Sequence, residues 1–125
     1  MPRMIIPTFH YRDAPAAIDF LERAFGFERG QVFEGEGERQ IAHAELRHGD
    51  GWVMLGSAGG DGLSTRPGSG TCYVVTEDVD ALHARAVAAG AEIVRELRDT
   101  DYGSRDFSAR DPEGNVWNFG TYAPA

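Results

Sequence analysis

The stretch that decides the fold spans residues 4–26 and is MIIPTFHYRDAPAAIDFLERAFG. It begins with an apolar, β-prone run at 4–10. From residue 13 onward its apolar residues recur at helical spacing, at Ala17, Phe20, Leu21 and Ala24. Asp13 suits the N-cap of this helix, Pro15 its first turn and Gly26 the left-handed residue after its last turn. The stretch therefore predicts a strand followed directly by a helix.

Three more strands are predicted after this helix. They cover 27–33, 40–47 and 52–57, where the residues are β-prone and partly alternate between apolar and polar. The segment 48–51, HGDG, lies between the last two strands and is a good hairpin signal. Residues 58–70 are rich in glycine and predict a linker.

The same order of elements then begins again. It comprises a strand at 71–76, a helix from 78 to 90 and strands at 92–97, 105–109 and 116–119. The helix starts Asp13 and Asp78 are 65 residues apart, and the helix-ending glycines Gly26 and Gly90 are 64 apart. A repeat of this length indicates the duplication of a whole βαβββ unit.

We therefore predict an α+β fold in which two tandem βαβββ units form an incomplete, barrel-like cup. The 125 residues suit a single domain, with a first unit at 1–57, a linker at 58–70 and a second unit at 71–123. Each unit offers a half-open sheet with a helix on one face, so the other faces are expected to line the cup. Small ligands usually bind in pockets at such a junction.

The composition limits the possible partners. The formal net charge is -8, which argues against nucleic acid, because phosphate binding needs clustered Lys and Arg. The charge is compatible with a cationic ligand, or with solubility alone. Cys72 is the single cysteine and cannot form an internal disulfide, which favours a reducing cytoplasm. No apolar stretch has the length of a membrane span, so no membrane partner is expected.

Two segments carry a family resemblance. Residues 9–21 are FHYRDAPAAIDFL, and residues 111–119 are DPEGNVWNF. The first resembles the first strand and helix of the vicinal oxygen chelate superfamily (glyoxalase, bleomycin-resistance and extradiol dioxygenase proteins). The second is similar to the Asp-Pro-x-Gly turn and last strand of that family, and 43–46 and 53–55 look like its glyoxalase-like and bleomycin-resistance-like branch. The resemblance covers nearly the whole chain and implies the fold more strongly than any activity.

By the same resemblance, metal-dependent members hold a divalent ion with His, Glu or Gln side chains from the first and fourth strands of each half. The corresponding positions here are Pro7, Met54, Thr71 and Asn118. None of these is a strong ligand for a hard divalent ion, and a catalytic site needs about three good protein ligands. Shifting the register by one residue adds only Cys72. We therefore expect no metal and no other cofactor.

His43 and Glu45 form a competing constellation. They are two residues apart on a predicted strand and share a face, whereas the alternating residues Ala42, Ala44 and Leu46 are expected to pack on a helix. A His and a carboxylate in the cup can bind a metal or act as a base and its orienter. Alternatively, they are a polar pair that lines a wet pocket or a dimer edge, since two ligands do not make a metal site.

Strand alternation predicts a lining that is apolar and aromatic with a few polar anchors, as in most ligand pockets. The predicted ligand-binding residues are Phe9, His43, Glu45, Trp52, Met54, Thr71, Tyr73, Arg105 and Asn118. Trp52 and Tyr73 are suited to stack on a planar ligand, although an aromatic residue can instead fill the core or a subunit interface. Arg105 can reach an anionic group, or it can be a salt-bridged residue at a strand edge.

Two functions stay open. The first is a metal-free binding protein, similar to the drug-sequestering bleomycin-resistance branch, that holds a planar or cationic molecule. The second is a glyoxalase-like lyase or isomerase, or a dioxygenase, with a divalent metal at a shifted site that uses His43 and Glu45. The weak donors at the four metal positions favour the first function. The resemblance also implies a homodimer whose clefts form between subunits.

Overall fold

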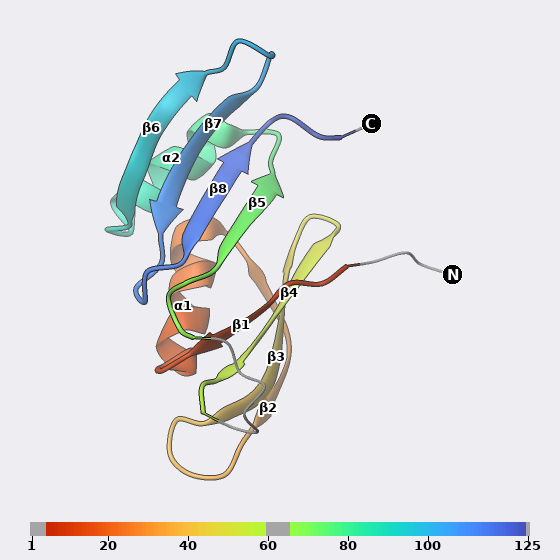
Figure 1. The fold of residues 1–125 in the computed structure, drawn as a ribbon, viewed down its shortest axis with the longest axis vertical. Coiled ribbons are helices and arrows are strands. Elements are labelled where there is room, and N and C mark those ends of the chain that lie inside the picture. Colours follow the sequence, from red (N-terminus) through yellow and green to blue (C-terminus); the bar gives the residue numbers. More distant parts are fainter. Residues whose placement is uncertain (1–4, 60–65, 125) are drawn as a thin grey trace.

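The computed structural model of the chain describes residues 5–59 and 66–124, so the middle of the predicted linker, 60–65, lies outside the described residues. The order strand, helix, strand, strand, strand occurs twice (Figure 1). The first half consists of β1 (Thr8–Tyr11), α1 (Ala14–Phe25), β2 (Glu28–Glu34), β3 (Ile41–His48) and β4 (Gly51–Ser57). The second half consists of β5 (Thr71–Val75), α2 (Val79–Ala88), β6 (Glu92–Asp99), β7 (Arg105–Arg110) and β8 (Val116–Gly120). The predicted α+β fold of two βαβββ units is confirmed.

Each half forms its own open, four-stranded sheet. The strand orders are β1-β4-β3-β2 and β5-β8-β7-β6, so β1 and β5 are edge strands. β1 runs parallel to β4 and β5 runs parallel to β8, whereas the other neighbours are antiparallel. Thr8 pairs with Met54 and Tyr73 pairs with Asn118, so these two pairs occupy equivalent places in the two sheets.

The helices begin at equivalent caps. The Asp13 side chain accepts a hydrogen bond from the Ala16 backbone N–H, and the Asp78 side chain accepts one from the Ala81 backbone N–H. Helix α1 ends at Gly26, whose φ of 76° is the left-handed conformation that glycine adopts without strain. In the described part of the chain, neither helix is both long and apolar enough to cross a membrane.

The helix sides of both sheets share one core. The Trp117 ring on β8 lies 4.9 Å from Phe9, 6.1 Å from Phe25 and 5.4 Å from Phe27 of the first half, measured between ring centroids. Arg85 of α2 donates hydrogen bonds to carbonyl oxygens in the last turn of α1, and the two helices lie next to each other (Figure 1). The two units are therefore packed against each other, with α1 next to α2.

A buried hydrogen-bond network also joins the halves at turn 111–115. The Tyr11 hydroxyl and the Trp117 indole N–H donate to the same carboxylate oxygen of Asp111, at 2.6 Å and 3.0 Å. Burial, with the Asp111 charge as a second cause, raises the pKa of Tyr11 far above its usual value. The Glu113 carboxylate accepts from the backbone N–H groups of Arg12 and Asp13, at 2.7 Å and 2.8 Å. This turn thus fixes the start of α1 to the second half.

Candidate functional site

The face of the first sheet that points away from α1 carries several predicted site residues. The strand register places Met54 between Thr8 on β1 and Glu45 on β3, and places Trp52 beside Arg47. The alternating residues on the other face are buried on the helix side, namely Ala44, Leu46, Val53 and Leu55. The predicted residues that share the open face are His43, Glu45, Trp52 and Met54.

His43 and Glu45 form a polar pair on this face. The His43 Nε2 atom lies 3.0 Å from a carboxylate oxygen of Glu45, and the two side chains are 38% and 34% exposed. The Phe33 ring lies 6.0 Å from the His43 ring. A carboxylate on one ring nitrogen orients an imidazole, so the pair has the geometry of a base and its orienter. The same carboxylate also offers a negative charge to a bound cation.

Trp52 has a defined position next to this pair. A Cβ atom at Gly30 would lie 3.1 Å from both the Trp52 ring and the backbone oxygen of Glu45, so glycine lets the indole pack against the sheet. The Arg47 guanidinium lies 5.8 Å from the indole centroid, within cation–π range. Beside the indole is a pocket of about 280 Å³, lined by Ile6, Glu45, Trp52 and Met54.

The open face of the second sheet carries Asp106 and Ser108 where the first carries His43 and Glu45. Ser108 donates a 2.6 Å hydrogen bond to the Asn118 side-chain oxygen. The Asn118 amide nitrogen donates to the Thr71 hydroxyl at 3.0 Å and to the Cys72 carbonyl oxygen at 3.1 Å. Tyr73 and Val75 continue this face and are 43% and 45% exposed. The predicted residues here, Thr71, Tyr73 and Asn118, thus lie on one face of the second sheet.

The residues at the metal positions do not fit a divalent ion. The register places Thr8, and not Pro7, beside Met54 on the open face, so the position predicted on the first strand was wrong by one residue. Likewise Tyr73, and not Thr71, lies beside Asn118, so the position predicted on the fifth strand was wrong by two residues. Thr8 is again a weak neutral donor, and Asn118 already uses both ends of its amide. Across residues 5–59 and 66–124, no group of three or more His, Cys, Asp or Glu could hold an ion. That the protein works without a metal stays a prediction.

Phe9 does not line the open face. It pairs with Leu55, and both side chains are buried on the helix side. Phe9 is only 6% exposed and packs on Trp117. Its predicted contact with a ligand was therefore wrong, and the alternative of an aromatic residue in the core is correct.

Arg105 does not reach the open face either. Its guanidinium donates to Asp80 on α2 at 2.9 Å and to Asp99 at 3.3 Å. The hydrogen bond from Arg105 lowers the pKa of Asp80. On β7, Arg105 alternates with the buried residues Phe107 and Ala109 of the helix side. The prediction that Arg105 lines the cup was wrong, and it is the salt-bridged alternative that the structure has.

Sequence reasoning missed Asp106, which occupies the open face of β7 together with Ser108. Asp106 is only 8% exposed and accepts a hydrogen bond from the Arg98 guanidinium at 3.1 Å. The alternation along β7 is the signal that could have found it. Tyr102 and Tyr122 were also missed; they lie in the turn before β7 and in the segment after β8, where no strand pattern exists.

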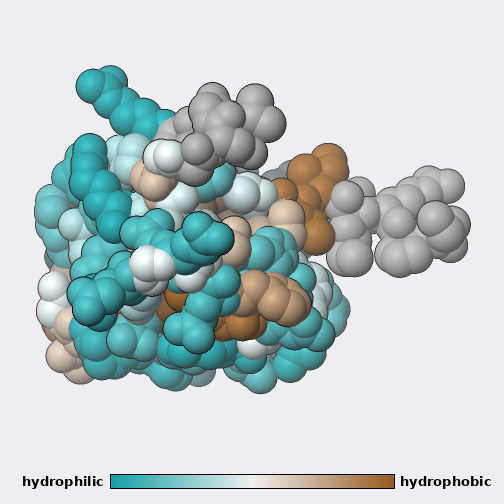
Figure 2. Space-filling view, turned by 90° about the horizontal axis from the view of Figure 1, so that it is seen from below, coloured by the Kyte–Doolittle hydropathy of each residue, from teal (hydrophilic) through white to brown (hydrophobic). Residues whose placement is uncertain are grey.

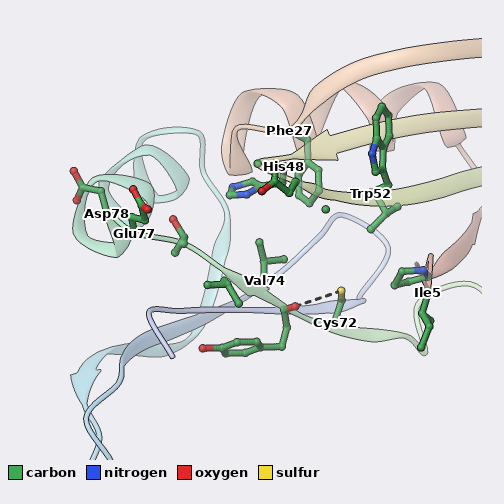
Figure 3. A pocket seen from close by; sticks show the side chains of 16 residues that line it. Ile5, Phe27, His48, Trp52, Cys72, Val74, Glu77 and Asp78 are labelled. Carbon is green, nitrogen blue, oxygen red and sulfur yellow. Dashed lines mark hydrogen bonds between the residues drawn. The ribbon is translucent and has the colours of Figure 1, made fainter. Parts of the chain in front are cut away.

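A wider cleft, of about 990 Å³, lies between the two halves. One wall is formed by the turn between β3 and β4 and the residues beside it, and the other by β5 and the start of α2. Figure 3 shows Phe27, His48 and Trp52 on one side and Cys72, Val74, Glu77 and Asp78 on the other. Burial raises the pKa of the Cys72 thiol and lowers the pKa of His48, so both groups favour their neutral forms.

By the duplication, the cleft has an equivalent between turn 111–115 and the start of α1, and there the two parts are in contact. Asp78 corresponds to Asp13 as a helix N-cap, and turn 48–51 corresponds to turn 111–115. Glu113 binds the backbone at the start of α1. Within the part of the chain that the structure describes, no hydrogen bond joins turn 48–51 to the start of α2. The cleft is therefore the open counterpart of a closed junction.

Comparison with known proteins adds three findings. Residues 8–119 match the family model described as Glyoxalase/Bleomycin resistance protein/Dioxygenase superfamily. An uncharacterized protein of Mycobacterium bovis is 36% identical over 117 residues, which cover 86% of this chain and 76% of that protein. The crystal structure of TioX from Micromonospora sp. ML1 superposes with a TM-score of 0.83 at 33% identity, covering 98% of this chain and 100% of TioX.

A lactoylglutathione lyase from Agrobacterium tumefaciens is a more distant structural neighbour. Its TM-score is 0.70 at 21% identity, covering 95% of this chain and 93% of that one. At this identity the likeness extends to the fold alone. Binding proteins and enzymes therefore have to be told apart by the residues on the open faces.

Proposed function

We propose that this chain, which belongs to the Glyoxalase/Bleomycin resistance protein/Dioxygenase superfamily, is a binding protein that sequesters a planar, cationic small molecule without a metal. The observation that carries the proposal is the position of the Glu45 carboxylate in one small pocket with the indole of Trp52. An aromatic face and a carboxylate together suit a flat cation, because stacking and charge attraction act on the same ligand. The net charge of -8 attracts such a ligand over a longer range.

A homodimer completes the proposed binding cup. The open-face residues form two groups on separate sheets, around Glu45 and around Asn118, and among the described residues no hydrogen bond or ring contact joins these two groups. The face seen in Figure 2 is mostly hydrophilic, with apolar residues exposed in few places. Exposed apolar residues on or beside the open faces include Phe33, Tyr73 and Val75. We propose that the first sheet of one copy faces the second sheet of another, in the cytoplasm, where the unpaired Cys72 stays reduced.

The test uses two probes that differ in charge. 9-Aminoacridine is a flat cation, and acridone is a neutral molecule of similar shape. We expect titration calorimetry to give saturable binding of 9-aminoacridine and at least tenfold weaker binding of acridone. Glu45→Gln and Trp52→Leu should each weaken 9-aminoacridine binding roughly tenfold, which corresponds to the loss of about 1.4 kcal/mol.

Glu36→Gln is the matched control, because Glu36 is an exposed carboxylate in the turn between β2 and β3. It removes the same charge and should leave the affinity unchanged. Equal affinity of both probes, or equal weakening by Glu36→Gln and Glu45→Gln, would mean that the Glu45 pocket does not bind the cation. Failure of 9-aminoacridine to bind at millimolar concentration would contradict the proposal as a whole.

The second candidate function is a glyoxalase-like lyase or isomerase, or a dioxygenase. One observation favours it: the 3.0 Å contact between His43 and Glu45, which is the geometry of a base and its orienter. The donors at the metal positions argue against it. Metal analysis of the purified protein separates the two functions. Stoichiometric Zn, Ni, Mn or Fe that is lost in His43→Ala would favour the enzyme.

A further inference from the structure

Three tyrosines cluster at one end of the second sheet, at some distance along the chain from one another. Tyr73 comes from β5, Tyr102 from the turn between β6 and β7, and Tyr122 from the segment after β8. They are 43%, 63% and 49% exposed. Contiguous exposed apolar surface can mark a site for a ligand or partner. The cluster is therefore a candidate binding site.

The tyrosine rings hold a defined arrangement. The Tyr102 and Tyr122 rings are perpendicular, with an interplanar angle of 90° and 5.9 Å between their centroids. The Tyr73 hydroxyl donates a 2.8 Å hydrogen bond to the Tyr122 backbone oxygen, which ties the third ring to the other two. In a T-shaped pair the edge of one ring points at the other ring, and the exposed remainder of both rings is left for a ligand to contact.

A buried carboxylate lies beside these rings. A Cβ atom at Gly120 would lie 2.5 Å from the Tyr73 hydroxyl and 3.1 Å from the Asp106 Cβ, so Tyr73 and Asp106 meet over Gly120. Burial raises the pKa of Tyr73, and the Asp106 charge adds to this increase. The hydrogen bond that Asp106 accepts comes from Arg98, whose side chain is 48% exposed. Because Arg98 offsets part of the Asp106 charge, the aromatic rings supply most of the attraction for a cation and Asp106 adds to it beside Tyr73.

We infer that Tyr73, Tyr102, Tyr122 and Asp106 form a binding site for a quaternary ammonium group. Aromatic faces attract cations, and they select methylated ammonium because its hydration shell is weak and its surface is apolar. A primary amine would instead seek direct hydrogen bonds. The site shares no residue with the Trp52 and Glu45 pocket of the same copy. In the proposed homodimer it faces the first sheet of the other copy, so the inference rests in part on the proposed function.

The test compares choline with 3,3-dimethylbutan-1-ol, which has the same shape without the charge. We expect NMR chemical-shift titration to show saturable binding of choline and at least tenfold weaker binding of the alcohol. Tyr102→Leu should weaken choline binding at least fivefold, whereas Tyr102→Phe, which keeps the π face, should stay within twofold of the wild type. Asp106→Asn should also weaken binding at least threefold, with Glu36→Gln as the control for lost charge.

Three outcomes would overturn the inference. Equal binding of choline and the alcohol would reduce the site to an apolar patch. Equal effects of Tyr102→Leu and Tyr102→Phe on choline affinity would show that the Tyr102 ring makes no cation–π contact. No saturable binding of choline by the wild-type protein would show that the tyrosines do not hold a quaternary ammonium group. Because the acridine titrations depend on Glu45 and Trp52, their result separates failure of this site from failure of the proposed function.

Discussion

The two junctions between the halves follow the same topology but are closed to different degrees. At one, turn 111–115 seals the start of α1: Asp111 binds three buried side chains, and Glu113 binds the helix backbone. At the other, turn 48–51 faces the start of α2 across a cleft of about 990 Å³. A duplicated fold thus fixes where the junctions are, whereas a few turn residues decide whether a junction closes.

The difference is traceable to the turns themselves. The strand pair Leu46–Val53 brackets six residues, and the equivalent pair Ala109–Trp117 brackets seven. The longer turn begins with Asp111, whereas His48 begins the shorter one. A buried aspartate can accept several hydrogen bonds at once, which an imidazole cannot do. The closed junction therefore depends on a carboxylate that the open junction lacks.

The largest effect is expected from Asp111→Ala. It leaves the Tyr11 hydroxyl and the Trp117 indole N–H buried without their acceptor, and each such group costs about 1–3 kcal/mol. We expect the free energy of unfolding to fall by about 4 kcal/mol, measured by urea denaturation. His48→Ala, at the equivalent place of the open junction, should cost about 1 kcal/mol or less.

If Asp111→Ala does not fold, Tyr11→Phe can be compared with His48→Ala in its place, with a smaller expected loss of stability. It removes one hydrogen bond to Asp111 and should cost about 1.5 kcal/mol. A loss no larger than that of His48→Ala would contradict the idea that the network holds the closed junction together.

An intermediate effect is expected from Glu113→Gln. The carboxylate accepts two backbone hydrogen bonds at the positive end of α1, and its side chain is only 12% exposed. Loss of its charge should reduce the free energy of unfolding by about 1 kcal/mol. Asp50→Asn makes the matching change in the exposed turn of the open junction and should stay within about 0.5 kcal/mol. Equal losses of unfolding free energy in Glu113→Gln and Asp50→Asn would contradict a difference between the two junctions.

The smallest effect concerns pH and His48. Burial lowers the pKa of His48 below its usual value of 6.5, so between these two pKa values the unfolded chain binds more protons than the folded one. The stabilising contribution is therefore complete above about pH 6.5 and is lost as the pH falls through this window. The urea midpoint should decrease more between pH 7.5 and pH 5.5 in the wild type than in His48→Gln. Parallel losses would contradict the assignment.

Much of the fold could be predicted from the sequence because each half repeats local signals. Asp13 and Asp78 each cap a helix as expected, and Gly26 ends the first one. On the longer strands, alternating burial fixed which side chains share a face, as for Glu45 on β3. A shared face, however, does not establish ligand binding, which stays a prediction for these residues.

Side chains were assigned to the wrong face where the alternation of apolar and polar residues does not define the register. Strand β1 is only four residues long and follows three apolar residues, so both registers fit the pattern. Its register is set by contacts far along the chain, namely its pairing with β4 and the hydrogen bond from Tyr11 to Asp111, 100 residues away. On β7, Arg105 was assigned from its place at the start of the strand, without using the apolar Phe107. Ala42 on β3 is likewise exposed and not packed on a helix as expected.

The cleft and the tyrosine cluster had no sequence signal. Both depend on how the halves and loops pack in three dimensions. Tyr73 lies on β5 and its face could be predicted, but Tyr102 and Tyr122 lie outside the strands, where no periodic pattern connects them to it. Likewise, neither wall of the cleft carries a motif that indicates the other.

The most direct test of the central claim is a calorimetric titration of 9-aminoacridine into protein treated with a chelator. The titration is then repeated after adding one equivalent of Zn²⁺, Ni²⁺, Mn²⁺ or Fe²⁺. We predict the same dissociation constant with and without metal, and weaker binding only in Glu45→Gln and Trp52→Leu. Binding that appears only with a metal ion, and disappears in His43→Ala, would contradict a metal-free binding protein.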